Sequence, residues 1–247
     1  MRTIAIVAQK GGTGKTSTAA ALCAGITRRG KRALAIDLDP QANLSFIMRA
    51  DTRHTTAKDL LEETAKAAQA IQQTPAGAII AASPLLSIAD IPRTANSRLK
   101  KALEAIAGQY DYCLIDCPPS LGPLTINGLT AADGVIIPTM PDALSLQGVG
   151  ALMQTIETVK AKANPSLQVM GLLLTRYSSR SLINRAGERQ TEEIAARNHT
   201  KVFKARIRET CSIRESQAMQ TDIFSYAPRS NGAADYSALI DEIEMEG

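Results

Sequence analysis

QKGGTGKTS, residues 9–17, is the stretch that decides the fold of this chain. It follows a short apolar run at residues 3–8 and opens onto Ala- and Leu-rich sequence at residues 18–26. A buried strand, a Gly-rich turn and a helix start, in that order, are the context of a phosphate-binding loop. Glycines let backbone N–H groups converge on an anion, and the helix N-terminus adds unpaired donors and the positive end of its dipole. The stretch therefore predicts a nucleotide site.

The loop departs from the common pattern G-x-x-x-x-G-K-S/T, because Gln9 stands at the position of the first glycine. Gly14, Lys15 and Thr16 are intact, and we expect Lys15 to reach the terminal phosphates and the Thr16 hydroxyl to bind Mg²⁺. A second lysine, Lys10, also precedes the loop glycines. A cation there is costly unless an anion lies near it. We prefer a nucleotide site to the alternative, a Gly-rich turn without a ligand.

The composition limits the fold class. Of the 247 residues 45% are hydrophobic, but only 3% are aromatic and none is Trp, so the core must be aliphatic. Strand and helix patterns alternate throughout, without a linker or internal repeat. We predict one α/β domain spanning residues 1–247, with a mostly parallel twisted sheet and helices on both faces. Because the first strand begins at Thr3, we expect no N-terminal helix-turn-helix domain.

The sequence disfavours a secreted or membrane-spanning protein and a cysteine-ligated metal site. Nothing resembles a signal peptide, and no apolar run approaches the roughly 20 residues that span a bilayer. The cysteines lack metal-ligand spacing, which favours reduced thiols in a cytoplasmic protein; they are Cys23, Cys113, Cys117 and Cys211. We therefore predict a cytoplasmic protein without a membrane role.

The hydrophobic periodicity predicts individual elements. Strands are expected at residues 32–36, 78–82, 112–116, 134–138, 168–175 and 201–205. Helices are expected at residues 56–73, 99–106, 146–159, 180–197 and 234–244.

Carboxylates follow two of the predicted strands. Asp37 and Asp39 follow the strand at residues 32–36, and Asp116 is the last residue of the strand at residues 112–116. Ligands in open α/β sheets bind at the carboxyl ends of the strands. An Asp after an aliphatic strand is also the usual partner of a phosphate loop, because it orients the Mg²⁺ shell. Two solvated turn aspartates remain the less favoured alternative for Asp37 and Asp39.

Charge is concentrated in two segments. Residues 176–214 contain ten Lys and Arg against four Asp and Glu, whereas residues 215–247 contain one against seven. A local basic block predicts weak, salt-sensitive and sequence-independent DNA binding. A solvated helix face with incidental arginines is the alternative. The candidate DNA contacts are Arg180, Arg185, Arg189, Arg206 and Arg214.

Four motifs, in order, resemble those of the ParA/Soj partition ATPases, part of the deviant-loop group that includes MinD and the nitrogenase iron protein. They are residues 10–16, residues 37–41 (DLDPQ), residues 112–124 and residues 226–230 (YAPRS). The resemblance covers nearly the whole chain. Thr13 stands where the family more often has Val, and Arg208 where it usually has Pro.

The resemblance implies residue roles. Lys10 would cross a dimer interface to the phosphates of ATP in the other subunit, and Asp39 would position the attacking water, as catalytic residues beside Lys15. Metal positions would be Thr16, Asp37 and Asp116. The ATP-binding residues would be Gly11, Gly12, Thr13, Gly14, Lys15, Thr16 and Ser17, with Thr175, Arg208 and Glu209 at the adenine.

The function implied by the resemblance is DNA partition. A homodimer formed on ATP and Mg²⁺ would bind nonspecific DNA of the nucleoid and segregate plasmid or chromosomal DNA. A centromere-binding, ParB-like partner would stimulate slow hydrolysis. The alternative is a related ATPase that positions a protein cargo. A metabolic P-loop kinase is disfavoured because no acceptor-substrate site is recognisable.

Overall fold

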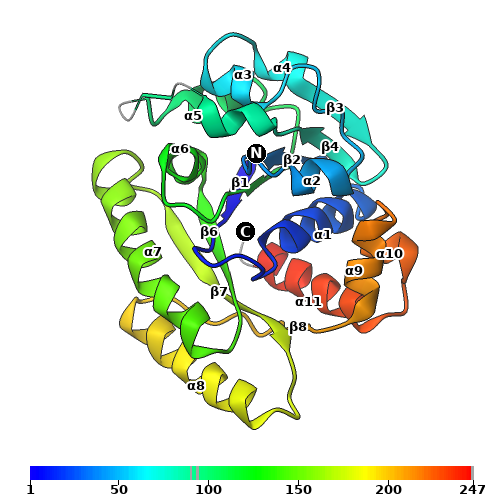
Figure 1. The fold of residues 1–247 in the computed structure, drawn as a ribbon, viewed down its shortest axis with the longest axis vertical. Coiled ribbons are helices and arrows are strands. Elements are labelled where there is room, and N and C mark those ends of the chain that lie inside the picture. Colours follow the sequence, from blue (N-terminus) through cyan, green and yellow to red (C-terminus); the bar gives the residue numbers. More distant parts are fainter. Residues whose placement is uncertain (90, 93–94, 246–247) are drawn as a thin grey trace.

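The structure is a computed structural model that describes residues 1–89, 91–92 and 95–245. Its described residues form one sheet of eight strands in the order β3-β4-β2-β5-β1-β6-β7-β8 (Figure 1). The strands are β1 (Arg2–Ile6), β2 (Ala33–Asp37), β3 (Ile71–Thr74), β4 (Gly77–Ile80), β5 (Tyr112–Asp116), β6 (Gly134–Thr139), β7 (Gln168–Tyr177) and β8 (Ile207–Arg208). Neighbouring strands pair in parallel except β3 and β4, which are antiparallel.

Helices cover both faces of the sheet, as the sequence predicted. One face carries α1 (Lys15–Arg28), α2 (Asn43–Ile47), α9 (Cys211–Ala218), α10 (Ile223–Tyr226) and α11 (Asn231–Met245). The other carries α3 (Ala57–Leu61), α4 (Ala67–Ala70), α5 (Arg98–Glu104), α6 (Pro123–Ala131), α7 (Ala143–Lys162) and α8 (Leu182–Arg197). A short 3₁₀ helix, η1, spans Pro84–Ile88.

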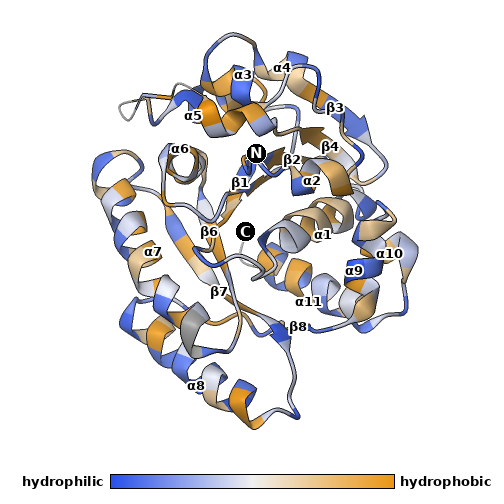
Figure 2. Cartoon of the chain, viewed as in Figure 1, coloured by the Kyte–Doolittle hydropathy of each residue, from blue (hydrophilic) through white to orange (hydrophobic). Residues whose placement is uncertain are grey.

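Strand alternation explains how one sheet serves two cores. In β1, Ile4 and Ile6 pack in the core under α1, whereas Ala5 and the following Val7 pack in the core under α7. Successive strand residues point to opposite faces, so a strand that is covered on both sides must be apolar throughout. Figure 2 shows this concentration of hydrophobic residues in the central strands β1, β6 and β7.

One predicted helix is wrong. The Ala-rich pattern at residues 56–73 predicted a single surface helix, but the structure has α3, α4 and the start of β3 there. Glu63 has a left-handed backbone (φ 60°), which no continuing α-helix accepts. Ile71 then pairs with Ile80 in β4, so sheet pairing overrides the local helix propensity.

The predicted strand at residues 201–205 is also wrong, because β8 begins at Ile207. A single bridge joins Val202 to Leu172, and the ladder then stops. The Glu242 carboxylate of α11 accepts hydrogen bonds from the backbone N–H groups of Lys204 (2.9 Å) and Ala205 (3.2 Å). These donors are therefore used by a side chain rather than by a strand.

The remaining predicted elements are present with small shifts at their ends. The strand at residues 112–116 has the predicted bounds, and the final helix is α11. Helices α2, α6, α9 and α10 were not predicted. The four cysteines are free thiols. No helix among the described residues is long and apolar enough to cross a membrane.

Candidate nucleotide site

The phosphate loop joins the carboxyl end of β1 to the N-terminus of α1. Gly12 (φ 76°) and Gly14 (φ 87°) have left-handed backbones that a side chain at either position would strain. The Thr175 hydroxyl at the end of β7 donates a hydrogen bond to the Thr13 carbonyl (2.8 Å). The loop is thus fixed before any ligand binds, with the first N–H groups of α1 unpaired at its centre.

Lys15 and Thr16 begin α1, as expected for a phosphate loop. The Lys15 side chain is buried, and Thr16 is half-buried beside it. Together with Asn43 and Phe46 of α2 they line a hollow on the phosphate side of the loop. An ammonium group held there is placed for the charge of a polyphosphate.

Two buried carboxylates meet below the loop. Asp116 lies beside Ile6 of β1 and opposite Asp37 of β2 in the parallel register, so three strands end together. Asp37 accepts hydrogen bonds from the Ser45 backbone N–H and hydroxyl (both 2.8 Å) and from the Asp39 N–H (3.0 Å). The Asp37 carboxylate therefore already holds the turn from β2 to α2, a role that the sequence did not indicate.

Asp116 differs from Asp37 in having no hydrogen-bond partner. Both of its carboxylate oxygens are buried without one among the described residues. Burial and then the Asp37 charge raise its pKa well above the ordinary range, while the nearby Thr16 hydroxyl and Lys15 charge act in the opposite direction. Burial also raises the pKa of Asp37 to about 6.

This unpartnered carboxylate fits a magnesium site. Buried polar groups are normally paired, so Asp116 indicates that something is bound beside it. Mg²⁺ keeps most of its waters and takes one or two carboxylates plus substrate phosphates. In keeping with that, the described residues contain no group of three or more His, Cys, Asp or Glu side chains able to hold a metal by themselves. Thr16 and Asp116 would hold the ion and its water shell.

Asp39 is half-buried at the exit of β2, and its carboxylate accepts a hydrogen bond from the Gln41 N–H (3.0 Å). Its position at the same edge of the sheet as the phosphate loop suits a residue that orients water. The predicted role of Asp39 stays a prediction.

Lys10 does not point at the phosphate hollow of its own chain. Its ammonium donates to the carboxylate of Asp142 and to the hydroxyl of Ser145, both at 3.1 Å. Asp142 is also the N-cap of α7, accepting from the Ser145 N–H (3.0 Å). Burial alone would raise the pKa of Asp142, but these hydrogen bonds from Ser145 and Lys10 hold it below its usual value.

The sequence analysis missed Asp142 and Ser145. The pattern Asp142-x-x-Ser145 before an apolar stripe is a helix N-cap that could have been recognised. Its pairing with Lys10, 132 residues away, could not.

Helix α8 touches the loop that carries Asp142. A Cβ atom on Gly187 would lie 2.3 Å from the carbonyl oxygen of Pro141, closer than any real contact. Only a glycine lets the helix approach so closely. The helix with two of the predicted DNA contacts, Arg185 and Arg189, therefore rests directly on the loop that holds Lys10.

A pocket of about 220 Å³ extends from the phosphate loop toward β8, which we call the base-side pocket. Its lining brings together Gly12, Gly14 and Ser17 with all three predicted adenine residues, namely Thr175, Arg208 and Glu209. Arg208 is fixed by a forked pair with Asp235 (2.6 and 3.0 Å). Arg176, which was not predicted, pairs with Glu209 at the pocket mouth (2.7 Å). Because the Thr175 hydroxyl already binds the loop, it supports the pocket wall.

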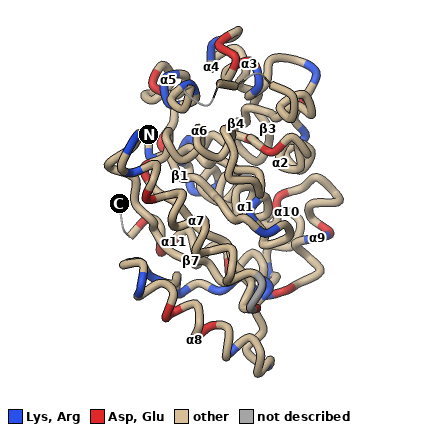
Figure 3. The backbone as a smooth tube through the Cα atoms, turned by 60° about the vertical axis from the view of Figure 1, so that its left-hand side comes forward, with Lys and Arg blue, Asp and Glu red and all other residues tan. Residues whose placement is uncertain are grey.

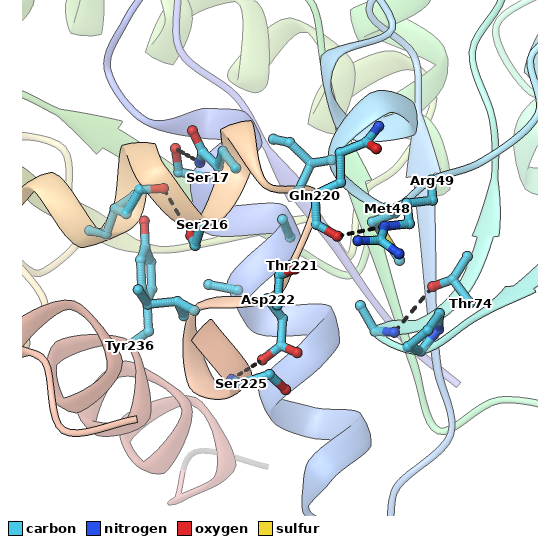
Figure 4. A pocket seen from close by; sticks show the side chains of 18 residues that line it. Ser17, Met48, Arg49, Thr74, Ser216, Gln220, Thr221, Asp222, Ser225 and Tyr236 are labelled. Carbon is cyan, nitrogen blue, oxygen red and sulfur yellow. Dashed lines mark hydrogen bonds between the residues drawn. The ribbon is translucent and has the colours of Figure 1, made fainter. Parts of the chain in front are cut away.

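A second cavity of about 220 Å³ lies between α1 and α9–α10 (Figure 4). Gln217 of α9 donates to the Ser17 hydroxyl (2.6 Å) where this cavity meets the base-side pocket. Arg49 closes the rim by donating to the carbonyls of Gln220 (2.9 Å) and Met219 (3.2 Å). Helix α9 is thereby tied to α1 and to α2.

The predicted DNA residues do not form one patch. Arg185 and Arg189 lie one turn apart on the exposed side of α8, and Arg180 just precedes the helix. Figure 3 shows charges of both signs along α8. Arg206 is neutralised by Glu188 (2.7 Å), with its side chain only 20% exposed. Arg214 lies on α9 and lines the base-side pocket instead.

Known proteins with similar sequences or structures agree with this geometry. A family model described as AAA domain matches residues 1–169. The chain is 37% identical to the sporulation initiation inhibitor protein Soj of Bacillus subtilis (strain 168), over 99% of this chain and 98% of that protein. It is 38% identical to the chromosome partitioning protein ParA of Caulobacter vibrioides (strain NA1000 / CB15N), over 98% of this chain and 94% of that protein.

A solved structure shares the whole fold. It is described as cobyrinic acid a,c-diamide synthase from Mycobacterium smegmatis with bound ATP analogue and magnesium. The TM-score is 0.86 at 32% identity, covering 100% of this chain and 95% of that one. The loop with two lysines and the carboxylates at the strand ends define a P-loop ATPase of the deviant kind. The chain belongs to the ParA/Soj family of P-loop partition ATPases.

Proposed function

We propose that this chain is a slow, Mg²⁺-dependent ATPase that dimerises on ATP, binds nonspecific DNA and drives partition of plasmid or chromosomal DNA with a ParB-like partner. The observation that carries the ATP-dependent part is the unpartnered, buried carboxylate of Asp116 beside Thr16 and Lys15. The names of the Soj and ParA relatives support the partition part.

The residues divide the work of hydrolysis. Lys15 and the N–H groups of the α1 N-terminus bind the phosphates, and Asp39 orients the attacking water. Mg²⁺, held near Thr16 and Asp116, would neutralise the negative charge of the phosphates. Asp116 would hold the water shell of the ion through oxygens that no described protein group uses.

Dimerisation follows from the position of Lys10. In the single chain its side chain is 34% exposed and its ammonium is paired with Asp142, away from its own phosphate hollow. ATP bound in a second subunit offers more negative charge than one partly exposed carboxylate. Lys10 therefore leaves Asp142 for the partner's ATP, which makes a complete site depend on two chains.

Two variants test the ATPase. Asp39→Ala is expected to bind ATP and remain dimeric because the water is no longer oriented, and Lys10→Ala is expected to bind nucleotide without dimer-dependent turnover. Sedimentation and phosphate release measure both. A monomer with a nonhydrolysable ATP analogue, or fast hydrolysis by Asp39→Ala, would refute these roles.

DNA binding is assigned to the segment around α8. Arg180, Arg185 and Arg189 are exposed, and none forms an ion pair with another described residue. Unpaired guanidinium groups on one surface neutralise phosphates and release counterions, which gives affinity that falls steeply with salt. Such binding would place the ATP dimer on the nucleoid.

A gel shift with random DNA tests this surface. Arg185→Ala with Arg189→Ala is expected to lower affinity at low salt and to reduce the salt slope by about 2 per monomer, since each phosphate contact contributes roughly 0.9. The matched control is Lys101→Ala with Lys162→Ala, which removes the same charge from exposed positions on α5 and α7. The assignment would be refuted if DNA binding depended on neither ATP nor salt. It would also be refuted if the two double variants lost the same DNA affinity.

One observation favours the second candidate function, positioning of a protein cargo. Leu182 and Ile183 at the start of α8 are 74% and 71% exposed. Large exposed apolar side chains beside arginines are typical of protein contacts. If the ATP dimer binds no DNA at low salt, while Leu182→Ser with Ile183→Ser abolishes stimulation by a partner, the cargo function is the better one.

A further inference from the structure

Helix α9 lies along the nucleotide site. Its Ile213, Arg214 and Gln217 line the base-side pocket, and Gln217 also borders the phosphate-side hollow beside Lys15. The hydrogen bond from Gln217 to Ser17 (2.6 Å) fixes this helix against the first turn of α1. Arg214 lies three residues before Gln217, so both side chains share one helix face.

Arg214 differs from the other two arginines of that pocket. Arg176 is paired with Glu209 and Arg208 with Asp235. The Arg214 guanidinium donates to the Cys211 sulfur at 3.6 Å, and within the described part of the chain no carboxylate pairs with it. A guanidinium that faces a phosphate loop without a carboxylate is suited to an anion of the ligand.

The position of Arg214 selects one part of the nucleotide. Gly12, Gly14 and Ser17 line both hollows, but Arg214 lines only the base-side pocket, whereas Lys15 and Thr16 line only the hollow on the phosphate side. Arg214 is therefore near the end of the loop that faces the nucleoside, away from the terminal phosphates. The phosphate at that end is the α-phosphate, which both ATP and ADP carry.

We propose that Arg214 is a nucleotide-binding residue whose guanidinium pairs with the α-phosphate of bound ATP or ADP, rather than a contact to DNA. This inference rests on the proposed ATPase function. It gives the pocket a charge contact that survives hydrolysis, since the α-phosphate is unchanged when ATP becomes ADP.

The substitution Arg214→Ala leaves the frame of the site intact. Helix α9 keeps its Thr210 N-cap and the Gln217–Ser17 bond, and Arg49 still binds the carbonyls at its C-terminus. The Arg214 side chain is exposed and has no structural ion pair to lose. The matched control is Lys162→Ala, which removes the same charge from an exposed position on α7 that does not line the pocket.

Calorimetric titration with a nonhydrolysable ATP analogue, ADP and 2′-deoxy-ADP tests the contact. Arg214→Ala is expected to raise all three dissociation constants alike, by roughly tenfold for a charge-assisted hydrogen bond that is partly exposed. Arg214→Lys is expected to recover part of the loss, and Lys162→Ala to bind like the wild type. Unchanged constants overturn the proposal. A loss confined to the ATP analogue points to a terminal phosphate, and a loss absent with 2′-deoxy-ADP points to the ribose; either also overturns it.

A second measurement separates this proposal from its alternatives. At nucleotide concentrations that saturate Arg214→Ala, random DNA is expected to be bound as tightly as by the wild type. If DNA binding is weaker under these conditions while the nucleotide dissociation constants are unchanged, Arg214 is a DNA contact and the proposal is wrong. Wild-type protein that binds neither ATP nor ADP would instead refute the proposed function.

Discussion

Replacing Asp142 by Asn is expected to tighten the ATP-dependent dimer. In the single chain the Lys10 ammonium is held by the Asp142 carboxylate and the Ser145 hydroxyl, and both contacts must break before Lys10 reaches ATP in another subunit. Asparagine caps a helix as well as aspartate does, so α7 keeps its N-cap while Lys10 loses its counter-charge.

The size of the effect follows from the exposure of the pair. The Lys10 and Asp142 side chains are 34% and 37% exposed, so the pair is partly screened and contributes about 1 kcal/mol. Two subunits each release one lysine, which amounts to about 2 kcal/mol or roughly a 30-fold lower dimer dissociation constant. Asp142→Ala also loses the N-cap of α7, so the free energy of unfolding of this variant is expected to be about 1 kcal/mol lower than that of Asp142→Asn.

Sedimentation velocity over a concentration series, with a nonhydrolysable ATP analogue and Mg²⁺, measures the dimer constant. Asp222→Asn is the matched control, because Asp222 is also an N-cap aspartate, of α10, and has no lysine partner among the described residues. It is expected to leave the constant unchanged. A dimer that is unaffected or weakened by Asp142→Asn would show that Asp142 does not compete for Lys10, and the reasoning would fail.

Three further predictions concern the buried groups. Asp116→Asn is expected to abolish Mg²⁺-dependent phosphate release. It is also expected to raise the melting temperature of the nucleotide-free protein, because a carboxylate is no longer buried there; each kcal/mol gained corresponds to about 2–4 °C. A lower melting temperature would contradict this prediction. Because burial raises the pKa of Asp37 to about 6, its contribution to folding is present at about pH 4 and is lost as pH rises to about 6. Urea unfolding of the nucleotide-free protein should show that loss, at most about 3 kcal/mol, and a smaller loss in Asp37→Asn, because the pKa of Asp116 is still raised by burial. Gly187→Ala is expected to lower the free energy of unfolding in urea by about 1–3 kcal/mol, because its Cβ would meet Pro141. Gly150→Ala in α7, where nothing lies within 4 Å of the added Cβ, is expected to raise it by about 0.5–1 kcal/mol. Equal effects of the two substitutions would contradict the close contact.

The sheet and its ligand edge could be predicted because local pattern and tertiary structure agree there. A continuous aliphatic run such as Tyr112–Asp116 fits only a strand covered on both faces, and the structure has the predicted bounds. The register that sets Asp37 beside Asp116 follows from two parallel strands that end at the same edge.

Two predicted elements failed where a distant partner overrides local propensity. Residues 56–73 have helical composition, but β3 gains a full antiparallel pairing with β4. At residues 201–205 a carboxylate from α11 replaces strand pairing. Neither partner lies within the window that sequence periodicity can use.

Side-chain pairing was the least predictable property of the site. Five arginines looked alike in the sequence, yet one is neutralised by Glu188 and another lines the nucleotide pocket. Likewise, Lys10 could be recognised as a second loop cation, but its partner Asp142 comes from another part of the chain. Side-chain pairing depends on which helices pack against each other, and that packing depends on the whole core rather than on a local sequence pattern.

The side chain of Glu242 has a consequence for solubility. A sheet edge with free N–H groups is a template on which a strand of another molecule can add, and the result is aggregation. Next to the short β8 edge, the N–H groups of Lys204 and Ala205 are already used by a carboxylate of the same chain. At this edge the protein is thus protected from growing into intermolecular sheets.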